Sequence, residues 1–91
     1  MTERGRITCL AGRVLREAIE YDVEATSMFV KLWCAEFGLW GSGSTEVAAL
    51  SELTSALTAT WEDYLITPDP ALGSVARLQK QRLRFLMGDL S

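Results

Sequence analysis

Apolar side chains recur at three- and four-residue steps through the first third of the chain. From Ile7 to Phe37 there is no proline, and Gly12 is the only glycine. One apolar stripe at this spacing is typical of an amphipathic helix, so the pattern predicts a helix over residues 7–37. The positions of the stripe are Leu10, Val14, Ala18, Tyr21, Ala25, Met28 and Leu32.

Two further helices are predicted after a glycine-rich turn at residues 38–45. Gly38 suits a helix C-terminus, and Ser44 or Thr45 suits the cap of the next helix, expected over 45–66. Asp69 and Pro70 then match the cap and first position of a third helix, expected over 70–90. The sequence therefore predicts an all-α fold, a long helical hairpin plus a shorter basic third helix, forming a single domain over residues 1–91.

The amino-acid composition argues against most classes of enzyme. The 91 residues include no histidine and no asparagine, so the commonest general base and metal ligand is missing. No serine, threonine or cysteine has an obvious activating base beside it. We expect a protein that is not an enzyme, with no cofactor, no metal site and no small-molecule substrate.

The two cysteines and the N-terminus bear on the compartment. On one continuous helix, Cys9 and Cys34 would lie about 37 Å apart, too far for a disulfide, and buried free thiols are expected. The N-terminal segment has no long apolar core of the signal-peptide kind. A cytoplasmic protein without a membrane contact is predicted.

Charge is unevenly distributed, although the formal net charge is only −3. Residues 17–76 hold ten acids and one base, Lys31, whereas both ends are basic. Glu20, Asp22 and Glu24 form an acidic run, but i,i+2 neighbours on a helix point to different sides and cannot jointly hold a cation. A solvated surface is the simpler interpretation of this run.

The chain carries a high density of large aromatic side chains, which three helices cannot easily hide. Ordinary core packing and burial between chains are both open interpretations. The second predicts a homo-oligomer, with an interface that includes Phe29, Trp33, Trp40 and Trp61.

A basic segment, RLQKQRLR, occupies residues 77–84. Its four positive side chains would contact DNA phosphates if they were exposed, with affinity that falls as salt rises. A solvated helix face is the alternative interpretation. Sequence-specific reading of bases is not expected, so the prediction is nonspecific DNA contact through Arg77, Lys80, Arg82 and Arg84.

The C-terminal half resembles the corresponding part of phage terminase small subunits. A helix with a tryptophan (Trp61), a Pro-Ala-Leu helix start at residues 70–72 and a leucine- and arginine-rich helix follow one another in the family's order. Leu78, Leu83 and Phe85 match in the last helix. The cover is about 40 residues. The chain lacks the family's N-terminal helix-turn-helix and its C-terminal tail, which puts recognition of a packaging site in doubt.

The resemblance implies an oligomeric, noncatalytic DNA-packaging subunit of a bacteriophage that partners a large terminase motor protein. The alternative is a small phage-type inhibitor or adaptor that binds a host protein through its acidic helical surface. A structural helical module with no polyanion contact is a third hypothesis.

Overall fold

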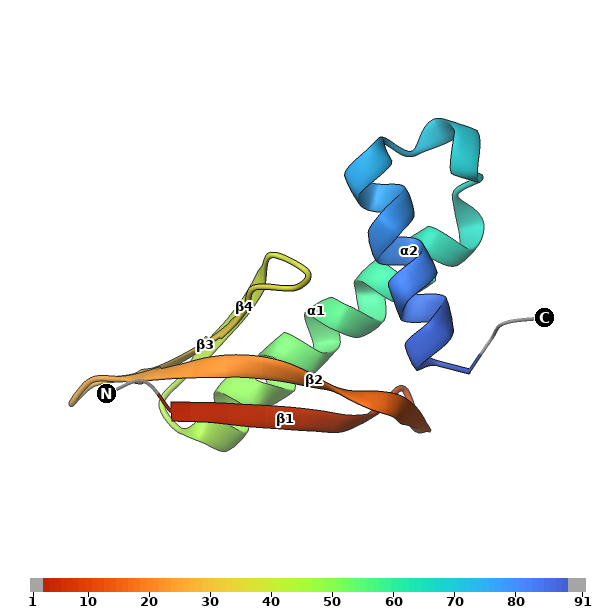
Figure 1. Cartoon of the computed structure of the whole chain (residues 1–91). Coiled ribbons are helices and arrows are strands. Elements are labelled where there is room, and N and C mark those ends of the chain that lie inside the picture. Colours follow the sequence, from red (N-terminus) through yellow and green to blue (C-terminus); the bar gives the residue numbers. More distant parts are fainter. Residues whose placement is uncertain (1–2, 89–91) are drawn as a thin grey trace.

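The first half of the chain forms strands, not a helix. The structure is a computed structural model that describes residues 3–88. Four strands, β1 (Glu3–Leu10), β2 (Arg13–Ala25), β3 (Val30–Cys34) and β4 (Leu39–Gly43), pair antiparallel in the order β1-β2-β3-β4. Two helices, α1 (Glu46–Ile66) and α2 (Ser74–Leu86), follow them (Figure 1). The fold is therefore α+β, and the predicted all-α helical hairpin is wrong.

The burial pattern shows why the helical prediction failed. Ile19, Tyr21 and Val23 lie at a two-residue spacing on one side of β2, and Leu32 and Cys34 do so on β3. This is the period of a strand with one face in the core. Two members of the proposed helical stripe, Val14 and Met28, are 77% and 84% exposed, so the three- and four-residue steps do not mark a buried face.

A tight turn at Ala11 and Gly12 lies where the predicted helix would have continued. Ala11 and Gly12 join β1 to β2 and have φ values of 51° and 78°. Two consecutive positive φ values are the signature of a type I′ hairpin turn. Gly12, interpreted as a tolerated break in a helix, is the residue that best permits this reversal.

The sheet divides into two hairpins that share only a short ladder. β1 and β2 pair along most of β1, with a register irregularity between Ile7 and Cys9. β2 and β3 pair only from Asp22↔Trp33 to Ala25↔Val30. The β3–β4 hairpin consequently diverges from the first half of β2 (Figure 1).

The helical half is closer to expectation. α1 covers Glu46–Ile66 against a predicted range of 45–66, and the Thr45 hydroxyl caps it by accepting the Ala48 N–H at 3.1 Å. The predicted third helix starts instead as a short 3-10 turn at Asp69–Ala71, and α2 begins at Ser74. The end of the predicted range, residues 89–90, lies outside the described residues.

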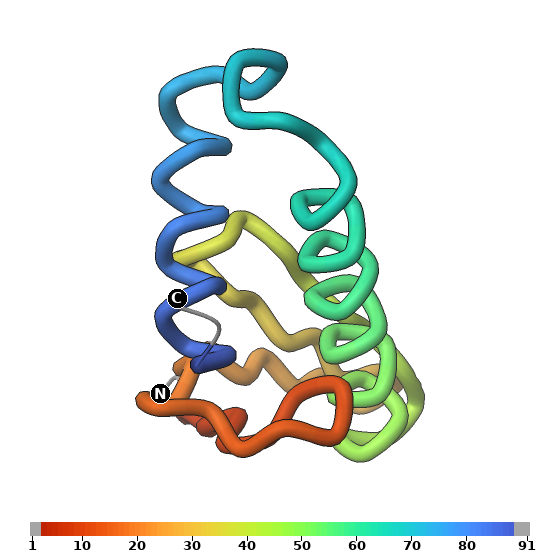
Figure 2. The backbone as a smooth tube through the Cα atoms, turned by 90° about the vertical axis from the view of Figure 1, so that its right-hand side faces the viewer, coloured from red at the N-terminus to blue at the C-terminus, as the bar shows by residue number. Residues whose placement is uncertain are grey.

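Both helices cover the same side of the sheet. α1 packs on β4 and β3, whereas α2 packs on β2. Figure 2 shows the two helices side by side and running in opposite directions. The fully buried core joins the sheet and the two helices through Ile19, Leu32, Cys34, Leu53, Leu57, Leu83 and Leu86.

Glycines in β4 let α1 approach the sheet closely. A Cβ at Gly41 would overlap backbone atoms of Ala49 and Leu53, and one at Gly43 would overlap Ala48 and Ala49. Because backbone cannot rotate away as a side chain can, the two glycines fix the depth at which α1 packs.

We predict that Gly41→Ala lowers the free energy of unfolding by about 2 to 3 kcal/mol, because α1 must move off the sheet. Gly73→Ala is the matched control, since nothing lies within 4 Å of its added methyl group. Chemical denaturation followed by circular dichroism measures both. Equal effects of the two substitutions would contradict the close packing of α1 on β4.

Candidate functional site

One face of the sheet is left uncovered by the described residues. Side chains that alternate with the core positions point away from both helices on this outer face. On β2 these are Glu20, Asp22 and Glu24, which are exposed or half-buried. The outer face also carries Arg4, Arg6, Lys31, Trp33, Trp40 and Ser42. It is the candidate functional site.

Two tryptophans stack on the outer face. Trp33 and Trp40 are direct cross-strand partners on β3 and β4, and their ring centroids lie 5.9 Å apart at an interplanar angle of 28°. Trp33 is 37% exposed and Trp40 is 56% exposed. The Lys31 ammonium lies 5.7 Å from the centroid of the Trp40 ring. Such a pair presents a large, rigid apolar area to a partner.

Opposite charges surround the tryptophan pair. Arg4 on β1 faces Asp22 on β2, with 3.2 Å between Nε and Oδ1, and lies 3.7 Å from Glu20. Glu24 is the cross-strand partner of Lys31. Exposed pairs of this kind add little stability, so their main effect is to pattern the face with charge.

The strand geometry corrects the interpretation of the acidic run. On a helix, Glu20, Asp22 and Glu24 would diverge, but on β2 all three point to the same face. A small hollow of about 130 Å³ lies beside them, lined in part by Arg4, Trp33 and Ala35. Arg4 already satisfies two of the carboxylates, so the hollow is not a vacant acidic site.

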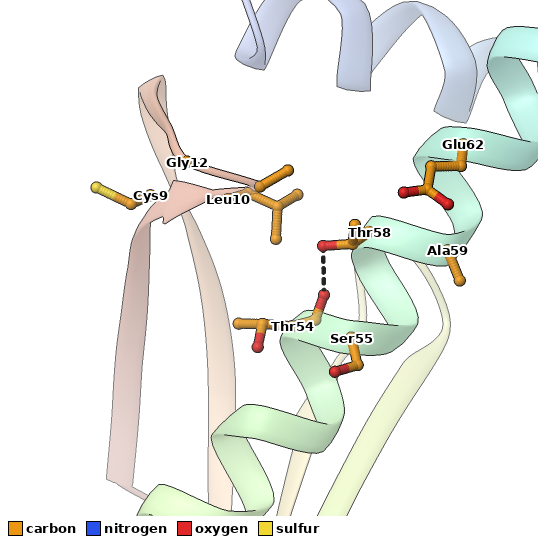
Figure 3. Close-up of a pocket in the computed structure, with 9 residues that line it drawn as sticks. Cys9, Leu10, Gly12, Thr54, Ser55, Thr58, Ala59 and Glu62 are labelled. Carbon is orange, nitrogen blue, oxygen red and sulfur yellow. Dashed lines mark hydrogen bonds between the residues drawn. The ribbon is translucent and has the colours of Figure 1, made fainter.

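A larger groove of about 460 Å³ lies between the β1–β2 turn and α1. Figure 3 shows that the Cys9 sulfur points away from it. The Thr54 and Thr58 hydroxyls donate to the main-chain carbonyls of Leu50 and Thr54, at 2.9 and 2.8 Å. These two hydroxyls are therefore used within α1.

The predicted interface residues do not all share one surface. Trp33 and Trp40 lie together on the outer face, and Phe29, 47% exposed, lies in the turn between β2 and β3. Trp61 is in α1 and is buried in the core. The cysteines also differ from expectation: both are free, but Cys9 is exposed. Cys34 is buried, and burial raises the pKa of its thiol.

The predicted DNA-binding residues all belong to α2, but two of them bind carboxylates of the same chain. Lys80 Nζ lies 2.8 Å from Asp69 Oδ1 and donates to the Thr67 carbonyl at 3.0 Å. Arg77 is exposed and Arg84 is half-buried. Among the ion pairs found within residues 3–88, neither Arg77 nor Arg84 takes part.

Arg82 joins three parts of the fold. Its Nε donates to Glu36 in the β3–β4 turn at 2.5 Å, and its Nη2 donates to Glu17 on β2 at 2.9 Å. The hydrogen bond that Arg82 donates to Glu36 is the main reason that the pKa of Arg82 is raised. The guanidinium also lies 5.7 Å from the centroid of Phe85, as does that of Arg16. Sequence spacing gave no signal for these long-range partners.

The Asp69–Lys80 pair predicts a specific titration behaviour. The hydrogen bond from Lys80 lowers the pKa of Asp69 below its ordinary value of 3.8. A lowered pKa means that the pair stabilises the fold above the ordinary value and loses that effect as pH falls through the folded-state value. We predict that Lys80→Gln raises the pKa of Asp69 toward 3.8, measured by NMR titration of its carboxyl carbon.

Arg77→Gln is the control for this titration, because Arg77 acts on Asp69 only through weaker charge attraction. It should move the Asp69 pKa less than Lys80→Gln does. An unchanged Asp69 pKa in the Lys80 variant would contradict the ion pair.

Neither a metal site nor a membrane-spanning helix is found within residues 3–88, and no relative is found by comparison with known proteins. Within residues 3–88 no group of three or more acidic or cysteine side chains is placed to hold a metal ion. The same part of the chain has no helix with the length and apolar character needed to span a bilayer. Comparison with protein-family models, curated proteins and solved structures finds no match.

Proposed function

We propose that the protein is a noncatalytic interaction module that assembles with copies of itself through the outer face of its sheet. The observation that carries this proposal is the exposed, stacked pair of Trp33 and Trp40. An interface buries rigid aromatic area at little cost in side-chain entropy, and tryptophans are enriched at binding hot spots.

The charges of the outer face support a second copy as the partner. Three positive side chains, Arg4, Arg6 and Lys31, are balanced by three negative ones, Glu20, Asp22 and Glu24. A face with both signs in equal number is unsuited to a polyanion, whose phosphates the carboxylates would repel. It suits a surface that carries the same two signs, as an identical copy does.

We also propose that the protein is noncatalytic and cytoplasmic, on the basis of its residue chemistry. The sequence has no histidine, and in the larger groove Glu62 is the only carboxylate among the lining residues. Free thiols at Cys9 and Cys34 fit a reducing compartment.

We predict that the wild-type chain is a multimer at high micromolar concentration and that Trp40→Ala shifts it to monomer. The reason is that the substitution removes the most exposed aromatic ring of the outer face. Size-exclusion chromatography with light scattering measures the mass.

Val47→Ala is the matched control, because Val47 is 79% exposed but lies on α1. The control should leave the mass unchanged, and circular dichroism should show all variants folded. A monomeric wild type would contradict the proposal and would favour the alternative, an adaptor that presents its acids to a host protein. In that case a strand would present four of the ten acids of residues 17–76, because Glu17, Glu20, Asp22 and Glu24 lie on β2.

A second candidate function is a DNA-packaging subunit, as the resemblance to phage terminase small subunits implies. The feature that favours it is the order of α1 with Trp61, the 3-10 turn at Pro70 and the basic helix α2. The predicted helical hairpin cannot be part of it, because residues 7–37 contain strands. DNA contact would fall mainly to Arg77 and Arg84, since Lys80 and Arg82 bind carboxylates.

For this candidate we predict weak DNA binding at low salt that the double variant Arg77→Gln/Arg84→Gln reduces. An electrophoretic shift assay at two salt concentrations measures it, and Arg6→Gln/Arg13→Gln controls for the loss of two charges elsewhere. No binding at low salt, or equal loss in both double variants, would rule out contact through α2.

A further inference from the structure

The outer face is organised in two cross-strand rows. The first row runs across all four strands and contains Arg4, Asp22, Trp33 and Trp40. The second row contains Glu24, Lys31 and Ser42 on β2, β3 and β4. Read by strand instead, the face is basic on β1, acidic on β2 and carries Lys31 and the two tryptophans on β3 and β4.

With the strands of the two copies aligned, these faces can stack in two symmetric ways. A two-fold axis between the sheets can run parallel to the strands, which places β1 over the partner's β4 and β2 over the partner's β3. It can instead run across the strands, which places every strand over its own counterpart. In the second arrangement Glu24 meets the Glu20 end of the partner's acidic strand, and like charges face each other.

We propose that the copies assemble about a two-fold axis parallel to the strands, so that the acidic strand β2 of each copy lies over β3 of the other. This inference rests on the proposed self-association. Rotation about such an axis does not change a residue's position along the strand direction, so each row lies over the same row of the partner. Glu24 therefore meets Lys31 of the partner subunit, and Arg4 meets the ring of the partner subunit's Trp40.

Each of these contacts is matched in chemistry. Glu24 and Lys31 carry opposite charges, and among the residues described Glu24 forms no ion pair within its own chain. An arginine over an indole face is a favourable cation–π contact. By the same rotation Trp33 lies over the partner subunit's Asp22 and diagonally beside the partner subunit's Trp33 next to the axis, whereas the Arg4–Trp40 contacts lie at the two edges of the interface.

The test is a charge reversal at one position. Glu24→Lys places a positive charge against Lys31 of the partner subunit at two symmetric contacts, and it should weaken self-association roughly tenfold. Lys31→Glu should weaken it similarly. Glu52→Lys, the same charge change at an exposed site on α1, is the control and should have little effect. Sedimentation equilibrium measures the dissociation constants.

An equimolar mixture of the Glu24→Lys and Lys31→Glu variants should recover an affinity close to that of the wild type. In the mixed dimer both contacts again join opposite charges. Within each variant chain residues 24 and 31 still carry like charges after mixing, so a recovered affinity must come from contacts between chains.

Each other result overturns a distinct claim. Glu24→Lys would strengthen association if the axis ran across the strands, because it would relieve the facing acids. Unchanged association of that variant, or no recovery on mixing, would also overturn the proposed axis while leaving a Trp40-dependent multimer intact. A monomeric wild type would overturn the proposed function itself.

Discussion

The packing of α1 against the bare backbone of β4 is the constraint on which the rest of the structure depends. Gly41 and Gly43 leave no side chain between helix and strand. The helix therefore covers β4 and β3 from one side at a fixed depth, with Leu32 and Cys34 fully buried beneath it. Alternation along the strands then directs Trp33 and Trp40 to the opposite side. The same two glycines thus determine both the core and the exposed aromatic pair.

The helical half of the fold was predictable because its local signals agree with its packing. Thr45 caps α1, and Leu53, Leu57 and Trp61 lie on the face that packs against the sheet. The first half was predicted wrongly because three- and four-residue steps can be picked out among its many apolar residues, whereas the buried residues, Ile19 and Tyr21 on β2 and Leu32 and Cys34 on β3, are spaced by two. The density of β-branched and aromatic residues, together with a turn at Ala11–Gly12, would have been the better guide.

The candidate site depended on pairings that a single sequence does not encode locally. Exposed aromatic area was foreseen at Trp33 and Trp40, but their stacking follows from the β3–β4 register. Trp61 belongs to the core, so composition alone could not separate structural from exposed indoles. Likewise, the basic character of α2 was visible in the sequence. The commitment of Arg82 to Glu17 and Glu36 was not, because these residues are 65 and 46 positions away.

The position of Arg82 after all four strands and α1 in the chain has a consequence for biosynthesis. Proteins emerge from the ribosome in order, at about 5 to 20 residues per second. The first hairpin is therefore complete long before the guanidinium that ties it to the turn at Glu36 has been translated. Until then the carboxylates of Glu17 and Glu36 lack their shared cation, and the apolar side of β2, which α2 covers, is exposed. Helix α2 therefore completes this core only after the sheet and α1 have been synthesised.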